Sequence, residues 1–147
     1  MSDKVFVDTD ILVYSRDASE PEKQQRAMAW MTHLWTVRAG RLSFQVLQEF
    51  YATVTQKLTP GLDPQSARED VRALLAWDPI PVNERVIEGA WLIQDRYKLS
   101  WGDALIVSAA QTGDCRLLLT EYLQENQAIG NIHVINPFRV SPESALP

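Results

Sequence analysis

The stretch LSWGDALIVSAAQTGD, from Leu99 to Asp114, indicates the fold most directly. Between Ala104 and Ala110 every residue except Ser108 is apolar or alanine. An α-helix turns through about 100° per residue, so these side chains face all around the helix, which is typical of a helix buried on most sides. The first turn nevertheless carries a carboxylate, Asp103, which by the same geometry lies along an inward-facing surface.

Asp103 therefore needs a partner, because a buried and unpaired carboxylate is too costly to keep. The partner is a hydrogen-bond donor, the N-terminal end of the helix, or a cation. An acid in the first turn of a helix gains about 0.3–1 kcal/mol from the helix dipole, so a structural role as a cap stays open for this residue. Whether a cation is the partner depends on acids elsewhere in the chain.

The composition is that of one globular domain. The chain has 147 residues, of which 46% are hydrophobic and 22% charged, enough for a sizeable core. Its net charge of −5 argues against non-specific binding of duplex DNA, which depends on dense Lys and Arg. The single cysteine, Cys115, excludes an intramolecular disulfide and the usual cysteine-based zinc sites, and two histidines are too few for a histidine-rich metal site.

We expect a soluble, cytoplasmic protein without a membrane partner. No apolar run approaches the length of a membrane span, and the N-terminal MSDKVFV is too short and too acidic for a signal peptide. We expect one folded domain over residues 1–138, followed by a tail over 139–147 that contains Pro and Ser.

Short apolar runs alternate with amphipathic segments, which predicts a three-layer α/β/α domain with a mostly parallel sheet of four to five strands. Gly40 is expected to close the second helix, and Ser43 and Asn83 to cap the N-termini of later ones. The predicted strands are 4–8, 41–44, 80–82, 115–120 and 132–135. The predicted helices are 9–17, 21–39, 45–57, 64–77, 84–98 and the helix of Asp103, which ends near 113.

Four acids from separate regions are predicted to meet at one edge of this sheet, where ligands bind beyond the carboxyl ends of the strands. Asp8 and Glu121 each end a strand, Asp103 opens a buried helix, and Glu49 borders the apolar face of another helix. Carboxylates that share a small site raise one another's pKa, and the usual compensation is Mg²⁺ or Mn²⁺. Metal ions in such sites activate a water molecule and stabilise the charge on the leaving oxygen in phosphodiester cleavage.

Each of these acids also has a plainer interpretation. Asp8, together with Asp10, can cap the helix that follows the first strand, and Glu49 can be a solvated residue on the polar side of its helix. Glu121 can be an ordinary acid in the first turn of a short helix. The metal site is therefore favoured by the joint placement of the acids rather than by any one of them.

Four segments, spread from Val5 to Phe138, resemble PIN-domain ribonucleases, and within these the VapC toxin type of bacterial toxin–antitoxin pairs. These segments are VFVDTDILVYS, FQVLQEFYATVTQK, LSWGDALIVSAA and LLLTEYLQENQ…INPF. The resemblance implies an endoribonuclease that depends on Mg²⁺ or Mn²⁺ and cuts structured or single-stranded RNA. By motif position, Asp8, Glu49 and Asp103 are the first, second and third acids of the family.

The resemblance also implies a homodimer, a cognate antitoxin whose C-terminal segment occludes the acids, and a sheet in which the strands lie in the order 3-2-1-4-5. One position departs from the family pattern, because the usual Ser/Thr-Glu-Asp-Leu reads Thr120-Glu121-Tyr122-Leu123. A phenol with a pKa near 10 is a poor ligand for Mg²⁺. Either Glu121 substitutes for the missing acid, or the activity is weakened.

Two alternatives remain open. Tyr122 leaves room for a degenerate PIN domain that binds antitoxin or RNA without cleaving it. Asp8 and Asp10 also resemble the acid pair of haloacid-dehalogenase-type phosphatases, but Leu12 stands where that family has Thr or Val. The phosphatase also needs a late acid pair, and the first acid after Asp103 is Asp114, too far along the chain.

Overall fold

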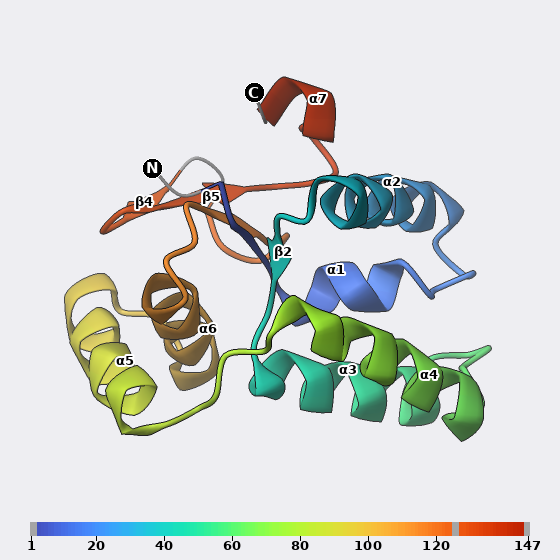
Figure 1. Cartoon of the computed structure of the whole chain (residues 1–147), viewed down its shortest axis with the longest axis horizontal. Helices are drawn as coiled ribbons and strands as arrows, with labels where there is room; N and C mark the ends of the chain where they lie inside the picture. Colours follow the sequence, from blue (N-terminus) through green and yellow to red (C-terminus); the bar gives the residue numbers. More distant parts are fainter. Residues whose placement is uncertain (1–2, 125–126, 146–147) are drawn as a thin grey trace.

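A five-stranded sheet lies at the centre of the computed structural model, which describes residues 3–124 and 127–145 (Figure 1). The strands lie in the order β2-β1-β3-β5-β4. The first four of these pair in parallel, and β4 pairs antiparallel with β5. The bounds are β1 Val5–Val7, β2 Gly40–Arg41, β3 Leu117–Leu119, β4 Ala128–Ile129 and β5 Ile132–Ile135.

Helices flank the sheet, as predicted. Figure 1 shows α2 and α7 on one side of the strands and α5 and α6 on the other, while α1, α3 and α4 form a group that begins where β1 ends. None of the described helices is long and apolar enough to cross a membrane. The helices are α1 Thr9–Tyr14, α2 Pro21–Val37, α3 Phe44–Gln56, α4 Pro64–Leu74, α5 Glu84–Tyr97, α6 Trp101–Thr112 and α7 Pro142–Ala145, and a 3₁₀ turn, η1, spans Leu75–Trp77.

The α6 helix is buried on most sides, as its sequence predicts. Every residue from Ile106 to Ala110 is buried, and Ala104 is buried as well. Ser108, the polar exception, donates a hydrogen bond from its hydroxyl to the Val86 carbonyl at 2.7 Å. The N-cap of α6 is Ser100, whose hydroxyl accepts from the Asp103 N–H at 3.2 Å. The Asp103 side chain is therefore not the cap of its own helix.

The sheet differs from the predicted order 3-2-1-4-5 at both edges. The predicted strand 80–82 is an isolated bridge, in which the Ile80 N–H donates to the Leu42 carbonyl at 3.0 Å beside β2. Prolines at 79 and 81 have no N–H to give and so prevent a longer ladder there. At the other edge, the unpredicted β4 turns back onto β5 through Gly130, which has a φ of 59°.

The predicted role of Gly40 as the end of the second helix is wrong. That helix ends at Val37, and Arg38 adopts the left-handed conformation and donates its N–H to the Leu34 carbonyl. Gly40 instead lies in β2, where a Cβ atom would stand 2.4 Å from the Trp77 ring. Packing of Trp77 against the strand therefore requires glycine here. The expected caps Ser43 and Asn83 are confirmed by hydrogen bonds from the N–H groups three residues later.

The C-terminal segment packs against α2. The Trp30 indole N–H donates to the Val140 carbonyl at 2.9 Å, and Pro142 is buried. Residues 146–147 of the predicted tail lie outside the described residues, as do 1–2 and 125–126. A boundary between domain and tail after residue 138 stays a prediction.

Candidate active site

Asp8 is the most deeply placed acid of the site. It follows β1 directly, and the parallel register of Val7 with Leu119 places it beside Thr120, which follows β3. The side chain caps α1 by accepting from the Thr9 N–H at 2.7 Å, and the residue is only 8% exposed. Burial raises the pKa of Asp8 to about 6, although hydrogen bonds from the Thr9 N–H and the Thr120 hydroxyl oppose this shift.

Glu49 and Asp103 lie close enough to Asp8 for their charges to raise its pKa further. Glu49, on α3, accepts a hydrogen bond from the Thr9 hydroxyl at 2.6 Å, which links it to the start of α1. Gln45 joins α3 to α6, because its side-chain amide donates to Glu49 at 3.3 Å and to the Gly102 carbonyl at 3.4 Å. The structure thus brings Asp8, Glu49 and Asp103 together from three separate elements.

Asp10 is a further acid of this site, although its place in the sequence indicated only a helix cap or part of a phosphatase pair. One of its oxygens, Oδ2, accepts from the Glu121 N–H at 2.8 Å. The other, Oδ1, is buried and receives no hydrogen bond from any residue that the structure describes. Burial, and then the charge of Asp8, raise the pKa of Asp10 to about 8.

The Glu121 side chain already has its partners. The carboxylate forms an ion pair with Lys23 of α2 and accepts from the Tyr14 hydroxyl at 2.8 Å. The Lys23 ammonium also lies 4.8 Å from the centre of the Tyr14 ring and 5.3 Å from that of Phe138. Glu121 lies two residues after the end of β3, and its side chain links that segment to α1 and α2.

Exposed aromatic rings flank the acids in sequence. Tyr122 is 70% exposed and follows Glu121 directly. Trp101 is 39% exposed and opens α6 two residues before Asp103. Neither ring is part of the core, so both present aromatic surface to solvent.

The residues present suit a hard divalent cation. In residues 3–124 and 127–145, no three Asp, Glu, His or Cys side chains form a ready-made cage for a metal ion. The donors at this edge are carboxylate, hydroxyl and amide oxygens, which Mg²⁺ and Mn²⁺ prefer. In the same described ranges, Asp10 Oδ1 and Gln45 Oε1 are the buried side-chain oxygens without a hydrogen bond, and both residues belong to this cluster of acids and their neighbours.

A sequence model of the PIN domain matches residues 5–121. The chain belongs to the PIN-domain family. No curated protein matches it in sequence. The match spans Asp8, Glu49 and Asp103, the three acids that the fold brings together.

Solved structures resemble this PIN domain in fold. One is a toxin–antitoxin complex from Klebsiella pneumoniae, with 19% sequence identity, a TM-score of 0.62, and coverage of 91% of this chain and 98% of that chain. Another is VapC20 of Mycobacterium tuberculosis, described as a toxin that cleaves the sarcin–ricin loop, with 17% identity, a TM-score of 0.53, and coverage of 78% and 87%. At these sequence identities the comparison shows a shared fold and no more.

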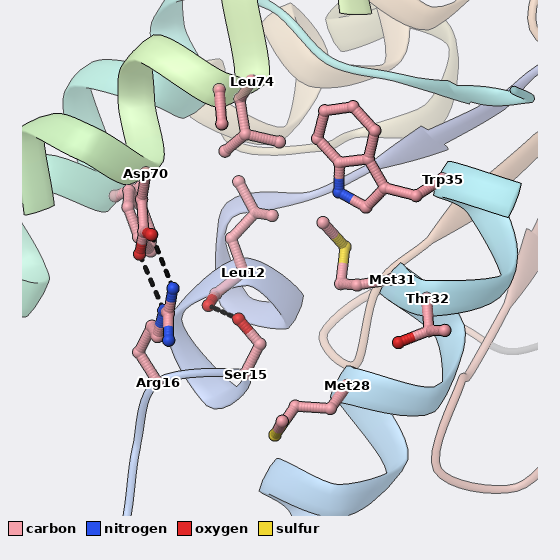
Figure 2. Close-up of a pocket in the computed structure, with 11 residues that line it drawn as sticks. Leu12, Ser15, Arg16, Met28, Met31, Thr32, Trp35, Asp70 and Leu74 are labelled. Atoms are coloured by element: carbon pink, nitrogen blue, oxygen red, sulfur yellow. Dashed lines mark hydrogen bonds and ion pairs between the residues drawn. The ribbon is translucent and has the colours of Figure 1, made fainter.

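The PIN domain also carries a cavity of about 290 Å³ between α1, α2 and α4, which is lined by both apolar and polar side chains. Figure 2 shows Met31 and Trp35 of α2 on one side of it and Leu74 of α4 across from them. Arg16 and Asp70 form a bidentate ion pair at the edge of this cavity, with N–O distances of 2.7 and 2.5 Å (Figure 2).

Proposed function

We propose that this PIN domain is an endoribonuclease that uses Mg²⁺ or Mn²⁺ held by Asp8, Glu49 and Asp103. The observation that carries the proposal is the environment of Asp8 at the end of a central strand, where burial and then the charges of Asp103 and Glu49 raise its pKa. Repulsion of this kind is unfavourable unless a cation relieves it. PIN-domain nucleases as a class generally depend on divalent metals, which agrees with this reading.

The chain supplies positioned oxygens for this chemistry. When bound, the metal would lower the pKa of a water molecule and stabilise charge on the phosphate oxygens. Asp8 is held in place by the Thr9 N–H and by Thr120. The Thr9 hydroxyl orients Glu49, and the Ser100 cap fixes the first turn that carries Asp103. Each of the three acids is thus positioned by a hydrogen bond to its side chain or by the cap of the helix that carries it.

The experiment is a cleavage assay with the purified chain, free of any partner, on unstructured RNA. We expect cutting with Mg²⁺ or Mn²⁺ and none with excess EDTA. Asp8→Asn and Asp103→Asn should each remove cutting while the circular dichroism spectrum stays that of the wild type. Cutting that persists in EDTA or in both variants would overturn the proposal, and unfolding of the variants would make these acids structural.

The biological role that we infer is that of a toxin controlled by an antitoxin chain. It is supported by the fold likeness to a chain of a toxin–antitoxin complex. It is also supported by the cavity between α1, α2 and α4, which shares α1 with Asp10 and offers Met28, Met31 and Trp35 as apolar contacts for a partner helix. We infer that a partner anchored there continues along α1 to the acids and blocks them.

The antitoxin can be tested with two matched variants of α2. Met28 lines the cavity, Val37 does not, and each is 50% exposed. If a small reading frame is found next to this gene, Met28→Glu should weaken the complex with its product by tenfold or more, while Val37→Glu should change that complex less than twofold. Equal effects of the two variants would place the partner elsewhere.

A homodimer is also part of the proposal. Phe44 and Leu75 are 42% and 46% exposed and border an apolar hollow of about 500 Å³ between α3 and α4. We expect a second copy to cover this surface. Light scattering should show a dimer that Leu75→Glu dissociates and that Leu92→Glu, at a 73% exposed position on α5, leaves intact. A monomer, or a dimer unaffected by Leu75→Glu, would contradict this part.

The non-cleaving alternative rests on Tyr122, which stands where the family pattern has an acid. It predicts that the wild type binds RNA without cutting it, whereas Tyr122→Asp cuts. The phosphatase alternative loses its support, because the PIN-domain match covers both acids of its motif.

A further inference from the structure

Three residues near Asp8 are candidates for a fourth oxygen ligand, and their surroundings differ. They are Asp10 on α1, Glu121 at the end of β3, and Tyr122 next to it. By family pattern the fourth acid belongs at the position of Tyr122. The structure allows the three to be compared by exposure, by existing partners and by the atoms left without a partner.

Tyr122 and Glu121 are poorly suited to the role. The Tyr122 side chain is 70% exposed, and a neutral phenol is a weak ligand for Mg²⁺. The Glu121 carboxylate is paired with Lys23, and the Tyr14 hydroxyl donates to it as well. To serve a metal ion, Glu121 would have to give up both contacts and leave the Lys23 ammonium facing two aromatic rings without its carboxylate.

Asp10 has the opposite environment. Its Oδ2 is fixed by the Glu121 N–H at 2.8 Å, so the side chain is already oriented. Its Oδ1 is buried and accepts no hydrogen bond from the described residues. A buried carboxylate oxygen without a partner costs free energy unless a hydrogen-bond donor or a cation lies next to it. Asp8, which stands two residues earlier, is close enough for its charge to act on Asp10.

We propose that Asp10 supplies the fourth carboxylate to the divalent cation. It thereby takes over the role of the acid that the family pattern has at the position of Tyr122. Glu121 then acts through its backbone, as the residue whose N–H aims Asp10, and its side chain anchors the segment to α1 and α2. This inference rests on the proposed function, since it concerns the same metal site. It also makes Tyr122 compatible with a complete set of four oxygen ligands.

The test measures Mn²⁺ binding directly, by the electron paramagnetic resonance signal of free Mn²⁺ during titration of the full chain. Asp10→Asn should lower the affinity at least tenfold or remove one bound equivalent. Asn keeps an oxygen for the Glu121 N–H, so the local fold is preserved. Glu121→Gln and Tyr122→Phe are the matched controls, and each should stay within twofold of the wild type.

The outcomes separate this inference from the proposed function. If Asp8→Asn loses Mn²⁺ while Asp10→Asn binds like the wild type, the metal site stands and Asp10 is not its ligand. If Glu121→Gln loses Mn²⁺ and Asp10→Asn does not, Glu121 is the fourth ligand. If the wild type binds no Mn²⁺ and cuts no RNA, both the inference and the proposed function fail. Circular dichroism of each variant shows that lost binding is not lost folding.

Discussion

The backbone N–H of Glu121 donates to Oδ2 of Asp10 at 2.8 Å, and so joins the segment after β3 to the first turn of α1. The two residues are 111 positions apart in sequence. This hydrogen bond holds one Asp10 oxygen while leaving the other buried without a partner in the described residues. Buried acids at this edge make the metal-free protein sensitive to pH and to neutralising substitutions.

We predict that the free energy of unfolding of the metal-free protein falls as pH rises from about 4 to 8. The folded pKa values of Asp8 and Asp10 are raised from 3.8 to about 6 and about 8, so the folded state holds protons that the unfolded state has released. The stability that these protons give is complete below pH 3.8 and is lost as pH passes the folded values. Asp8 contributes on the order of 3 kcal/mol, at about 1.4 kcal/mol per pKa unit.

Urea titrations in EDTA across this pH range measure the effect. Asp8→Asn should flatten the pH dependence and be more stable than the wild type at pH 8, because Asn also caps a helix. Parallel curves for wild type and variant would show that burial of Asp8 does not set the slope.

The ion pair between Lys23 and Glu121 should stabilise the fold rather than serve catalysis. We predict that Lys23→Met lowers the free energy of unfolding by roughly 1 kcal/mol, a modest value because the Lys23 side chain is 37% exposed. A double-mutant cycle with Glu121→Gln gives the coupling between the two side chains. A coupling of zero would mean that the pair is not formed in solution.

Two glycines provide a matched test of packing. A Cβ at Gly40 would stand 2.4 Å from the Trp77 ring, whereas a Cβ at Gly102 meets no described atom within 4 Å. Gly40→Ala should therefore destabilise by roughly 1–3 kcal/mol through overpacking. Gly102→Ala, in the first turn of α6, should stabilise by about 0.5–1 kcal/mol. Thermal denaturation measures both, and a reversed order would contradict the placement of Trp77 on β2.

The exposed rings beside the acids should bind single-stranded RNA. We predict that Trp101→Ala and Tyr122→Ala each raise KM fivefold or more with little change in kcat, since stacking of one base contributes roughly 1–3 kcal/mol. Trp91→Ala is the control, because Trp91 is 54% exposed on α5, a helix that carries neither Asp8, Glu49 nor Asp103. Equal effects at all three positions would show that the rings do not select the RNA.

The sequence predicts a helix or strand well where a long pattern of apolar residues determines which faces are buried. The continuous apolar run in α6 predicts a buried helix, and the structure confirms it. The short strand β4 was missed because two residues carry no periodicity, and its pairing depends on the turn at Gly130. The prolines at 79 and 81 limit the expected third strand to a bridge.

The site is less visible in the sequence, because long-range partners decide the role of each acid. The ends of β1 and β3 place Asp8 and Glu121 at one edge, which strand positions predict. That Glu121 pairs with Lys23, and that Asp10 has a buried oxygen without a described partner, depends on contacts across 98 and 111 positions. One signal in the sequence does point to Asp10 as a site residue. It is a second acid two residues after Asp8, close behind a buried strand.

The most direct test of a metal ion at the scissile phosphate is a metal switch on a substrate with sulfur at that position. The cleavage site in an RNA oligonucleotide is mapped first, and the oligonucleotide is then made with a single phosphorothioate at the cut. Sulfur binds Mg²⁺ poorly and Mn²⁺ better, because Mg²⁺ prefers hard oxygen ligands. We predict that one diastereomer is cut at least tenfold more slowly with Mg²⁺ and that Mn²⁺ restores the rate. Cutting of both diastereomers at the rate of the oxygen substrate in Mg²⁺ would contradict a cation held at this phosphate by Asp8, Glu49 and Asp103.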